Sequence, residues 1–164
     1  MGVPNSEKET APSEFVMQSI RLLSNIESLC RKLPKRWHET SGELLESARH
    51  IAKFATKANS VYAATVPEYD LRLRWLNDVY TECNYLSLRI AEIYRKHPVT
   101  YKTETLPDGS TEQVETECFT EKKLISLNES IEKLRKLLHG QIETYRAYRA
   151  KQIWKERQPD FGKG

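Results

Sequence analysis

Hydrophobic residues recur at steps of three and four positions between Tyr69 and Tyr94, which is the spacing of one face of an amphipathic α-helix. This stripe consists of Tyr69, Leu73, Leu76, Tyr80, Cys83, Leu86, Ile90 and Ile93. A helix of this length spans roughly 39 Å, more than the usual helix of a globular protein. Four further residues lie beside the stripe and widen it: Leu71, Trp75, Tyr85 and Leu88. The stretch therefore predicts the central helix of a bundle, in contact with two helices or with one helix and another subunit.

Two shorter amphipathic helices are predicted before it. The first begins after Ser13 as N-cap, ends before Pro34 and has the stripe Val16, Ile20, Leu23, Ile26, Cys30 and Leu33. The second begins at Thr40 or Ser41 and ends near Ala64. Its stripe is Leu44, Ala48, Ile51, Ala55, Ala58 and Tyr62. The small residues of the second stripe allow close approach of a neighbouring helix.

After Pro98 the pattern alternates with a period of two, and Pro107, Asp108 and Gly109 then form a turn signal. This predicts a β-hairpin over about residues 99–118. Because an isolated hairpin is only marginally stable, we expect it to lie against the bundle or to pair with another chain. The alternative is a charged loop.

A last helix is predicted from Thr120 to as far as Arg157. Its stripe is interrupted at Gln141 and consists of Leu124, Leu127, Ile131, Leu134, Leu138, Tyr145 and Tyr148. We expect the helix to leave the core at the interruption. The predicted fold is all-α, an up-down four-helix bundle with a β-hairpin between the third and fourth helices. The bundle covers residues 13–157, between a flexible N-terminal arm (1–12) and a flexible tail (158–164).

Composition fits one helical domain, with 38% hydrophobic and 30% charged residues among 164. The formal charge of +3 is small, so an anionic partner must be met by a local patch. Cys30, Cys83 and Cys118 include no CxxC pair, which favours a reducing compartment. Since no signal peptide or membrane-spanning run is evident, we expect a cytoplasmic protein without a membrane partner.

The sequence lacks the motifs on which catalysis commonly depends. It has no glycine-rich phosphate loop, no GxSxG nucleophile elbow and no cluster of metal ligands. His38 and Glu39 begin HETSGE, which lacks the second histidine of a zinc-protease motif. We therefore expect a protein that is not an enzyme and that uses no metal or cofactor.

Two segments combine basic and aromatic residues, as nucleic-acid-binding surfaces do. The connector between the first two helices contains Arg31, Lys32, Lys35, Arg36, Trp37 and His38. The last helix contains Arg146, Arg149 and Lys151 among Tyr145, Tyr148 and Trp154. Both segments are candidate nucleic-acid sites. The alternative for the connector is a solvated loop after a helix end that favours cations, and the alternatives for the last helix are a solvated helix end and a surface that docks a partner.

The chain resembles a known family in three segments. They are LPKRWH at the connector, the helix with alanines along one side, and LRLRWLNDVYTECNYLSLRIAEIY from Leu71 onward. It resembles the four-helix-bundle accessory variability determinant (Avd) proteins of diversity-generating retroelements. A sister group is encoded in intervening sequences of bacterial ribosomal RNA genes. The resemblance covers roughly residues 20–94 and, more weakly, the last helix. It implies a homopentameric barrel that binds RNA or DNA and associates with reverse transcriptase during mutagenic cDNA synthesis.

By position, the resemblance assigns basic surface roles to Lys35, Arg36, His38, Arg72, Arg74 and Arg89. The chain departs from the family pattern because it is less basic, carries the hairpin segment and extends its C-terminus. A structural or scaffolding bundle of a phage or mobile element remains the alternative. Such a protein would bind only protein partners, through its hairpin and hydrophobic faces.

Overall fold

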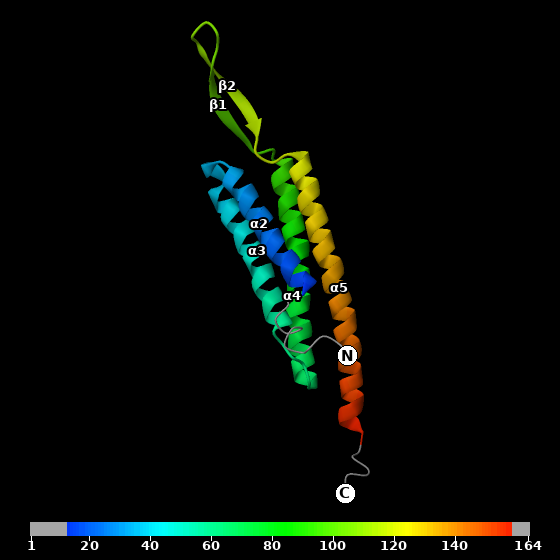
Figure 1. Cartoon of the computed structure of the whole chain (residues 1–164). Helices are drawn as coiled ribbons and strands as arrows, with labels where there is room; N and C mark the ends of the chain where they lie inside the picture. Colours follow the sequence, from blue (N-terminus) through cyan, green and yellow to red (C-terminus); the bar gives the residue numbers. More distant parts are fainter. Residues whose placement is uncertain (1–12, 159–164) are drawn as a thin grey trace, which may run out of the picture.

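A computed structural model describes residues 13–158, which form four long helices and one β-hairpin (Figure 1). The helices are α2 (Glu14–Lys32), α3 (His38–Asn59), α4 (Val66–Arg95) and α5 (Glu121–Arg157). Helix α2 packs against α3 and α5, and α4 packs against the same two helices. The mostly helical fold with a hairpin between its third and fourth long helices is thus confirmed. The predicted arm 1–12 and nearly all of the predicted tail lie outside the described residues.

The connections between helices follow from a few capping residues. Ser13 precedes α2 at the predicted N-cap position with an extended backbone, but its side chain makes no capping hydrogen bond. Pro34 follows α2, as predicted. Thr65 and Glu68 form a capping box at the start of α4, where each side chain accepts from the other residue's backbone N–H. The Thr120 side chain likewise accepts from the backbone N–H of Lys123 and begins α5. Pro67 lies in the first turn of α4, where its missing N–H costs nothing.

Two predicted limits of the second helix are wrong. Helix α3 starts at His38 rather than at residue 40 or 41, because the 3₁₀ helix η1 (Lys35–Trp37) leads directly into it. It ends at Asn59 rather than near Ala64. Tyr62 therefore lies beyond the helix and is 67% exposed instead of belonging to the buried stripe.

The hydrophobic core runs along the inner faces of the four helices. The predicted stripe of α4 is confirmed at its fully or nearly fully buried positions Leu73, Leu76, Cys83, Leu86, Ile90 and Ile93. The stripe predicted for α2 is wrong at Ile20, which is 48% exposed. Since α2 packs against both α3 and α5, its buried line instead follows Phe15, Leu22, Ile26 and Leu29.

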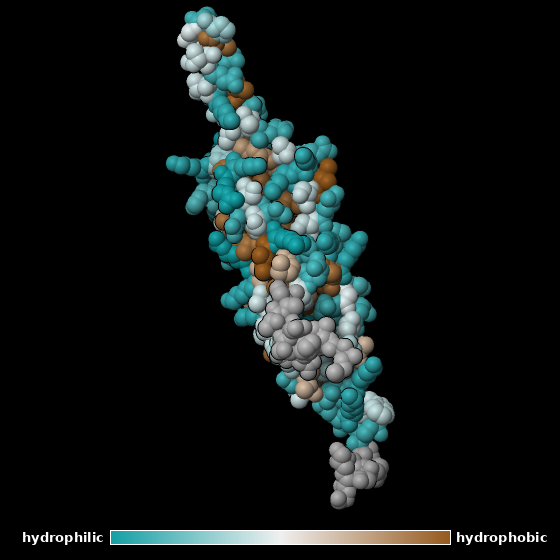
Figure 2. Space-filling model, viewed as in Figure 1, coloured by the Kyte–Doolittle hydropathy of each residue, from teal (hydrophilic) through white to brown (hydrophobic). Residues whose placement is uncertain are grey.

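The hairpin consists of the antiparallel strands β1 (Val99–Thr105) and β2 (Thr111–Glu117), in the place that the sequence predicts. Gly109 has a φ of +86°, a conformation that a turn can give to glycine without steric cost. The strands project past the end of the bundle (Figure 1), and their surface is mostly hydrophilic (Figure 2). The expectation that the hairpin lies against the bundle is therefore wrong, because only its base is buried, at Val99 and the adjoining Cys118. Pairing with another chain stays a prediction.

Candidate nucleic-acid interface

The connector between α2 and α3 brings five of its predicted site residues to the surface. Pro34 ends α2, and the single 3₁₀ turn that follows leaves no room for an acidic residue between the helices. The exposed residues are Arg31, Lys32, Lys35, Arg36 and His38. Within residues 13–158, none of the four Lys and Arg side chains lies within ion-pair distance of a carboxylate. Their charge is thus available to an anion from outside.

Arg36 also has a structural contact. Its Nη2 donates a hydrogen bond of 2.7 Å to the backbone oxygen of Val99, the first residue of β1. The connector and the base of the hairpin are therefore joined at the same end of the bundle. Because a guanidinium has five N–H donors, this bond leaves others free for a phosphate.

Trp37 does not provide the stacking surface that the sequence predicts. It is half-buried and packs against the hydrophobic core, and its Nε1 is buried without a hydrogen-bond partner in the described residues. The prediction of an exposed ring beside the cations is wrong at this position, since the turn of η1 directs the indole inward. Trp37 anchors the connector instead.

The start of α5 adds a cation that the sequence analysis missed. The pKa of Lys123 lies below its ordinary value because burial disfavours the charged amine and, secondly, because nearby Lys32 repels it. Two like charges from distant parts of the sequence therefore lie close together. A bound anion would relieve this repulsion.

A groove of about 470 Å³ lies between the end of α2 and the start of α3. Its basic lining residues are Arg31, Lys35, His38 and Arg49, and Glu27 is its one carboxylate. The remaining lining residues are Cys30, Leu33, Pro34, Ser41, Gly42 and Leu45, of which Leu33 is buried. The groove thus combines an apolar interior with a cationic edge.

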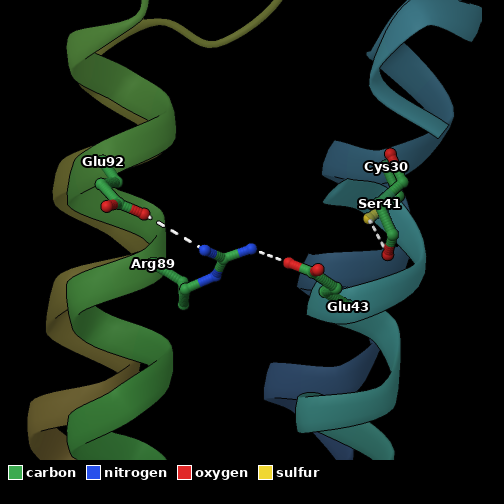
Figure 3. A network of polar contacts seen from close by, with 5 residues as sticks. All are labelled: Cys30, Ser41, Glu43, Arg89 and Glu92. Atoms are coloured by element: carbon green, nitrogen blue, oxygen red, sulfur yellow. Dashed lines mark hydrogen bonds and ion pairs between the residues drawn. The ribbon is translucent and has the colours of Figure 1, made fainter. Parts of the chain in front are cut away.

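Cys30 faces this groove as a neutral thiol. Its Sγ donates a hydrogen bond of 3.6 Å to the backbone oxygen of Ser41 and so joins α2 to α3 (Figure 3). Burial raises the pKa of the Cys30 thiol, although the contact with Ser41 and the charge of Arg49 oppose that rise. A protonated thiol is a weaker nucleophile than a thiolate.

Arg72 is not a surface residue, and its predicted role in a basic surface is wrong. Its side chain is 5% exposed, and Nη1 donates hydrogen bonds to the backbone oxygens of Ala58 (2.7 Å) and Val61 (3.3 Å). Nη2 donates to Oε1 of Gln141 at 3.2 Å, and Cζ lies 3.9 Å from the centre of the Tyr145 ring. Arg72 therefore joins α3, α4 and α5 inside the protein.

Arg89 and two of the three predicted site residues on α5 form ion pairs with carboxylates. Arg89 forms ion pairs with Glu43 of α3 and with Glu92 one turn along α4 (Figure 3). In α5, ion pairs join Arg146 to Glu143 and Arg149 to Asp70. Lys151 and Arg74 are exposed and have no ion pair within residues 13–158.

The two basic segments do not form one surface within a single chain. The end of α5 lies at the opposite end of the molecule from the connector and the hairpin (Figure 1). Since its arginines are also paired, the α5 segment is the weaker candidate. The connector is the candidate interface of this chain.

Sequence reasoning predicted His38 but missed the groove residues Gly42, Leu45 and Arg49 on α3, although a signal for them exists. His38, Gly42, Leu45 and Arg49 follow steps of four, three and four, so they share one helix face next to the buried stripe. The missed signal is Arg49, a cation at the end of this second stripe of α3, which is less apolar than the buried one. No comparable spacing points to Lys123, because it is brought near by the tertiary fold.

The described part of the chain contains no group of three or more His, Cys, Asp or Glu residues that could hold a metal ion. None of its helices combines the length and the hydrophobicity that crossing a membrane requires. Comparison of the chain with protein-family models, with curated proteins and with solved structures gives no match.

Proposed function

We propose that this protein is a non-enzymatic accessory protein of a diversity-generating retroelement, which binds RNA or DNA and the reverse transcriptase to support mutagenic cDNA synthesis. The observation that carries the proposal is the set of unpaired cations around the connector groove. The resemblance of the connector and of α4 to Avd proteins supports it and supplies the identity of the protein partner. No match from the comparisons contributes to it.

Nucleic-acid binding at the connector would act through the phosphates. Arg31 and Arg36 offer planar guanidinium groups that suit bidentate contacts with phosphate oxygens, whereas Lys32 and Lys35 act as mobile point charges. Each contact releases condensed counterions from the nucleic acid, so binding weakens as salt rises. The proposal therefore predicts that binding depends strongly on salt concentration. It also places the protein in the cytoplasm.

We also propose that the four helices alternate in direction as an up-down bundle, and that five copies of this bundle assemble into a barrel. Exposed hydrophobic residues on α4 support association between copies: Leu71, Tyr85 and Leu88, the last of which is 71% exposed. Large apolar side chains gathered on one helix face are a common sign of an interface. Native mass spectrometry tests the assembly, and a mass other than five chains would contradict the pentamer.

The binding proposal is tested with the double variant Lys32→Ala/Lys35→Ala. Both residues are exposed and have no hydrogen bond or ion pair in the described residues, so the variant should fold normally. Lys53→Ala/Lys136→Ala is the matched control, because it removes the same charge from exposed sites on α3 and α5.

The measurement is fluorescence anisotropy of a labelled single-stranded RNA across a salt series. We expect the connector variant to lower the slope of log affinity against log salt by about 1.4, since each phosphate contact to a single strand contributes roughly 0.7. The control should keep the wild-type slope. Equal slopes for the two variants, or no binding by the wild type at low salt, would contradict the proposal.

The second candidate function is a scaffold that binds only proteins. The projecting hairpin favours it, because its strands leave their outer edges unpaired in the described chain and because most of their charged residues are acidic. Deleting residues 101–117 separates the two candidates. A scaffold loses its protein partner on deletion and shows no nucleic-acid binding before or after it, whereas the accessory protein keeps nucleic-acid binding through the connector.

A further inference from the structure

We propose that the connector groove holds one unstacked nucleotide of a single-stranded nucleic acid, with the base among the apolar residues and the adjoining phosphate on the cationic edge. This inference rests on the proposed function and adds to it a preference for single strands. It also assigns roles to α3 residues outside the basic run of the connector.

The size and lining of the groove suit a base. Its volume of about 470 Å³ lies within the range of roughly 300–1,000 Å³ that small-molecule sites occupy. Cys30, Leu33, Pro34 and Leu45 offer the apolar surface that the face of an unstacked base requires. Gly42 lines the α3 side of the groove, and a side-chain carbon at that position would meet no atom within 4 Å, so a larger residue can be placed there.

The charges of the groove suit the phosphate next to such a base. Arg31 and Lys35 approach from the connector, and Arg49 approaches from two turns further along α3 than Gly42. Their three positive charges face the single carboxylate of Glu27. That carboxylate repels phosphate but accepts hydrogen bonds from the amino groups of bases, so the lining fits a nucleotide better than a plain polyanion.

Only an unstacked base can enter this groove. In a duplex the bases are paired and stacked, and extruding one costs the free energy of that pairing and stacking. A single strand presents its bases without that cost. The groove therefore predicts tighter binding of a single strand than of a duplex of the same sequence.

The test fills the groove without changing its charge. Gly42→Leu adds a large side chain to the lining of the groove, and Gly140→Leu is the matched control. Both glycines are helical and have free space around the added carbon, and Gly140 lies outside the groove on α5. Leucine is a better helix former than glycine, so both variants should fold. Thermal unfolding followed by circular dichroism verifies this.

Anisotropy titrations use a 12-nucleotide single-stranded RNA, its duplex, inorganic polyphosphate and the free nucleotide CMP as probes. We expect the wild type to bind the single strand at least tenfold more tightly than the duplex or polyphosphate. Gly42→Leu should remove most of this difference, and Gly140→Leu should preserve it. A second variant, Arg49→Gln, should weaken single-strand binding several-fold, with Lys53→Gln as its control.

The outcomes separate this inference from the function on which it rests. Two results would overturn the groove assignment while the proposed function stands. In the first, binding depends on salt but is equal for the single strand and the duplex. In the second, Gly42→Leu leaves binding of the single strand unchanged. The wild type could also bind free CMP as tightly as the single strand and lose this binding in Gly42→Leu. The groove would then be a site for free nucleotides, and the assignment to a strand would be overturned. Absence of binding to every nucleic acid would remove both proposals.

Discussion

Arg72 gives the most direct test of the internal architecture, because it joins three helices through one side chain. Replacement by alanine removes its hydrogen bonds to the backbone oxygens of Ala58 and Val61 and to the side chain of Gln141. It also removes the contact with the Tyr145 ring. Ala58 lies in the last turn of α3 and Val61 just beyond it, where the carbonyl groups at a helix end carry partial negative charge. Arg72 therefore acts as a cap supplied by the next helix.

The size of the effect follows from opposing terms. Burial lowers the pKa of Arg72, which shows that keeping its charge inside the protein has a cost. Hydrogen bonds that involve a charged group contribute about 1.5–3 kcal/mol each, but this cost offsets part of their sum. Truncation also leaves a cavity and unpaired polar groups. We expect Arg72→Ala to lower the free energy of unfolding by about 3 kcal/mol, and Tm by roughly 10 °C.

Two further variants identify the cause of the loss. Arg72→Met keeps most of the side-chain volume without the donors, so it should lose about 1–2 kcal/mol if the hydrogen bonds matter. Arg74→Ala removes an exposed arginine from the same helix and should change stability by less than about 0.5 kcal/mol. Urea unfolding followed by circular dichroism measures all three. The reasoning is refuted if Arg72→Ala is no less stable than Arg74→Ala.

Three other predictions concern single local contacts. Burial raises the pKa of Cys83 to about 12 from an ordinary value of 9.0, so the native state retains its proton longer than the unfolded chain. The free energy of unfolding of the wild type should therefore fall as the pH rises from 9 to 12. Its slope should exceed that of Cys83→Ala by up to about 1.4 kcal/mol per pH unit. Urea unfolding at several pH values measures both slopes. Thr65→Ala removes the capping box of α4 and should cost about 1 kcal/mol, whereas equal urea midpoints would contradict its role. Gly109→Ala strains the turn of the hairpin by about 1–2 kcal/mol, which should speed amide hydrogen exchange in β1 and β2 but not in α4.

The long elements were predictable because their patterns are strong and local. The stripe of α4 repeats over the whole helix, and the alternation and turn residues of the hairpin place both strands. Helix ends and the rotation of a weakly biased helix were less predictable. On α2 hydrophobic residues occur on more than one face, so contacts with α3 and α5 decide that Leu22 is buried and Ile20 is exposed.

The polar residue Gln141 interrupts the hydrophobic stripe of α5, and its hydrogen-bond partner on another helix explains the interruption. The sequence suggests that α5 leaves the core there, yet the next residue, Ile142, is buried. Gln141 replaces a hydrophobic residue because its amide oxygen accepts a hydrogen bond from Arg72. Each of these polar residues looks misplaced or solvent-facing when its own helix is considered alone. Only the packing of α4 against α5 shows that they are partners.

Local spacing explains only some of the ion pairs among the predicted site residues, because Arg31 and Arg74 have carboxylates four positions away and pair with none of them. Arg89 and Arg146 each have a glutamate three positions away on the same helix, a spacing at which side chains meet, and both form that ion pair. Lys32 has no carboxylate three or four positions away in either direction. Arg149 lacks a local signal, because its partner Asp70 lies on another helix. Free positive charge is therefore a property of the folded surface, and all four Lys and Arg residues around the turn that joins α2 to α3 keep it within residues 13–158.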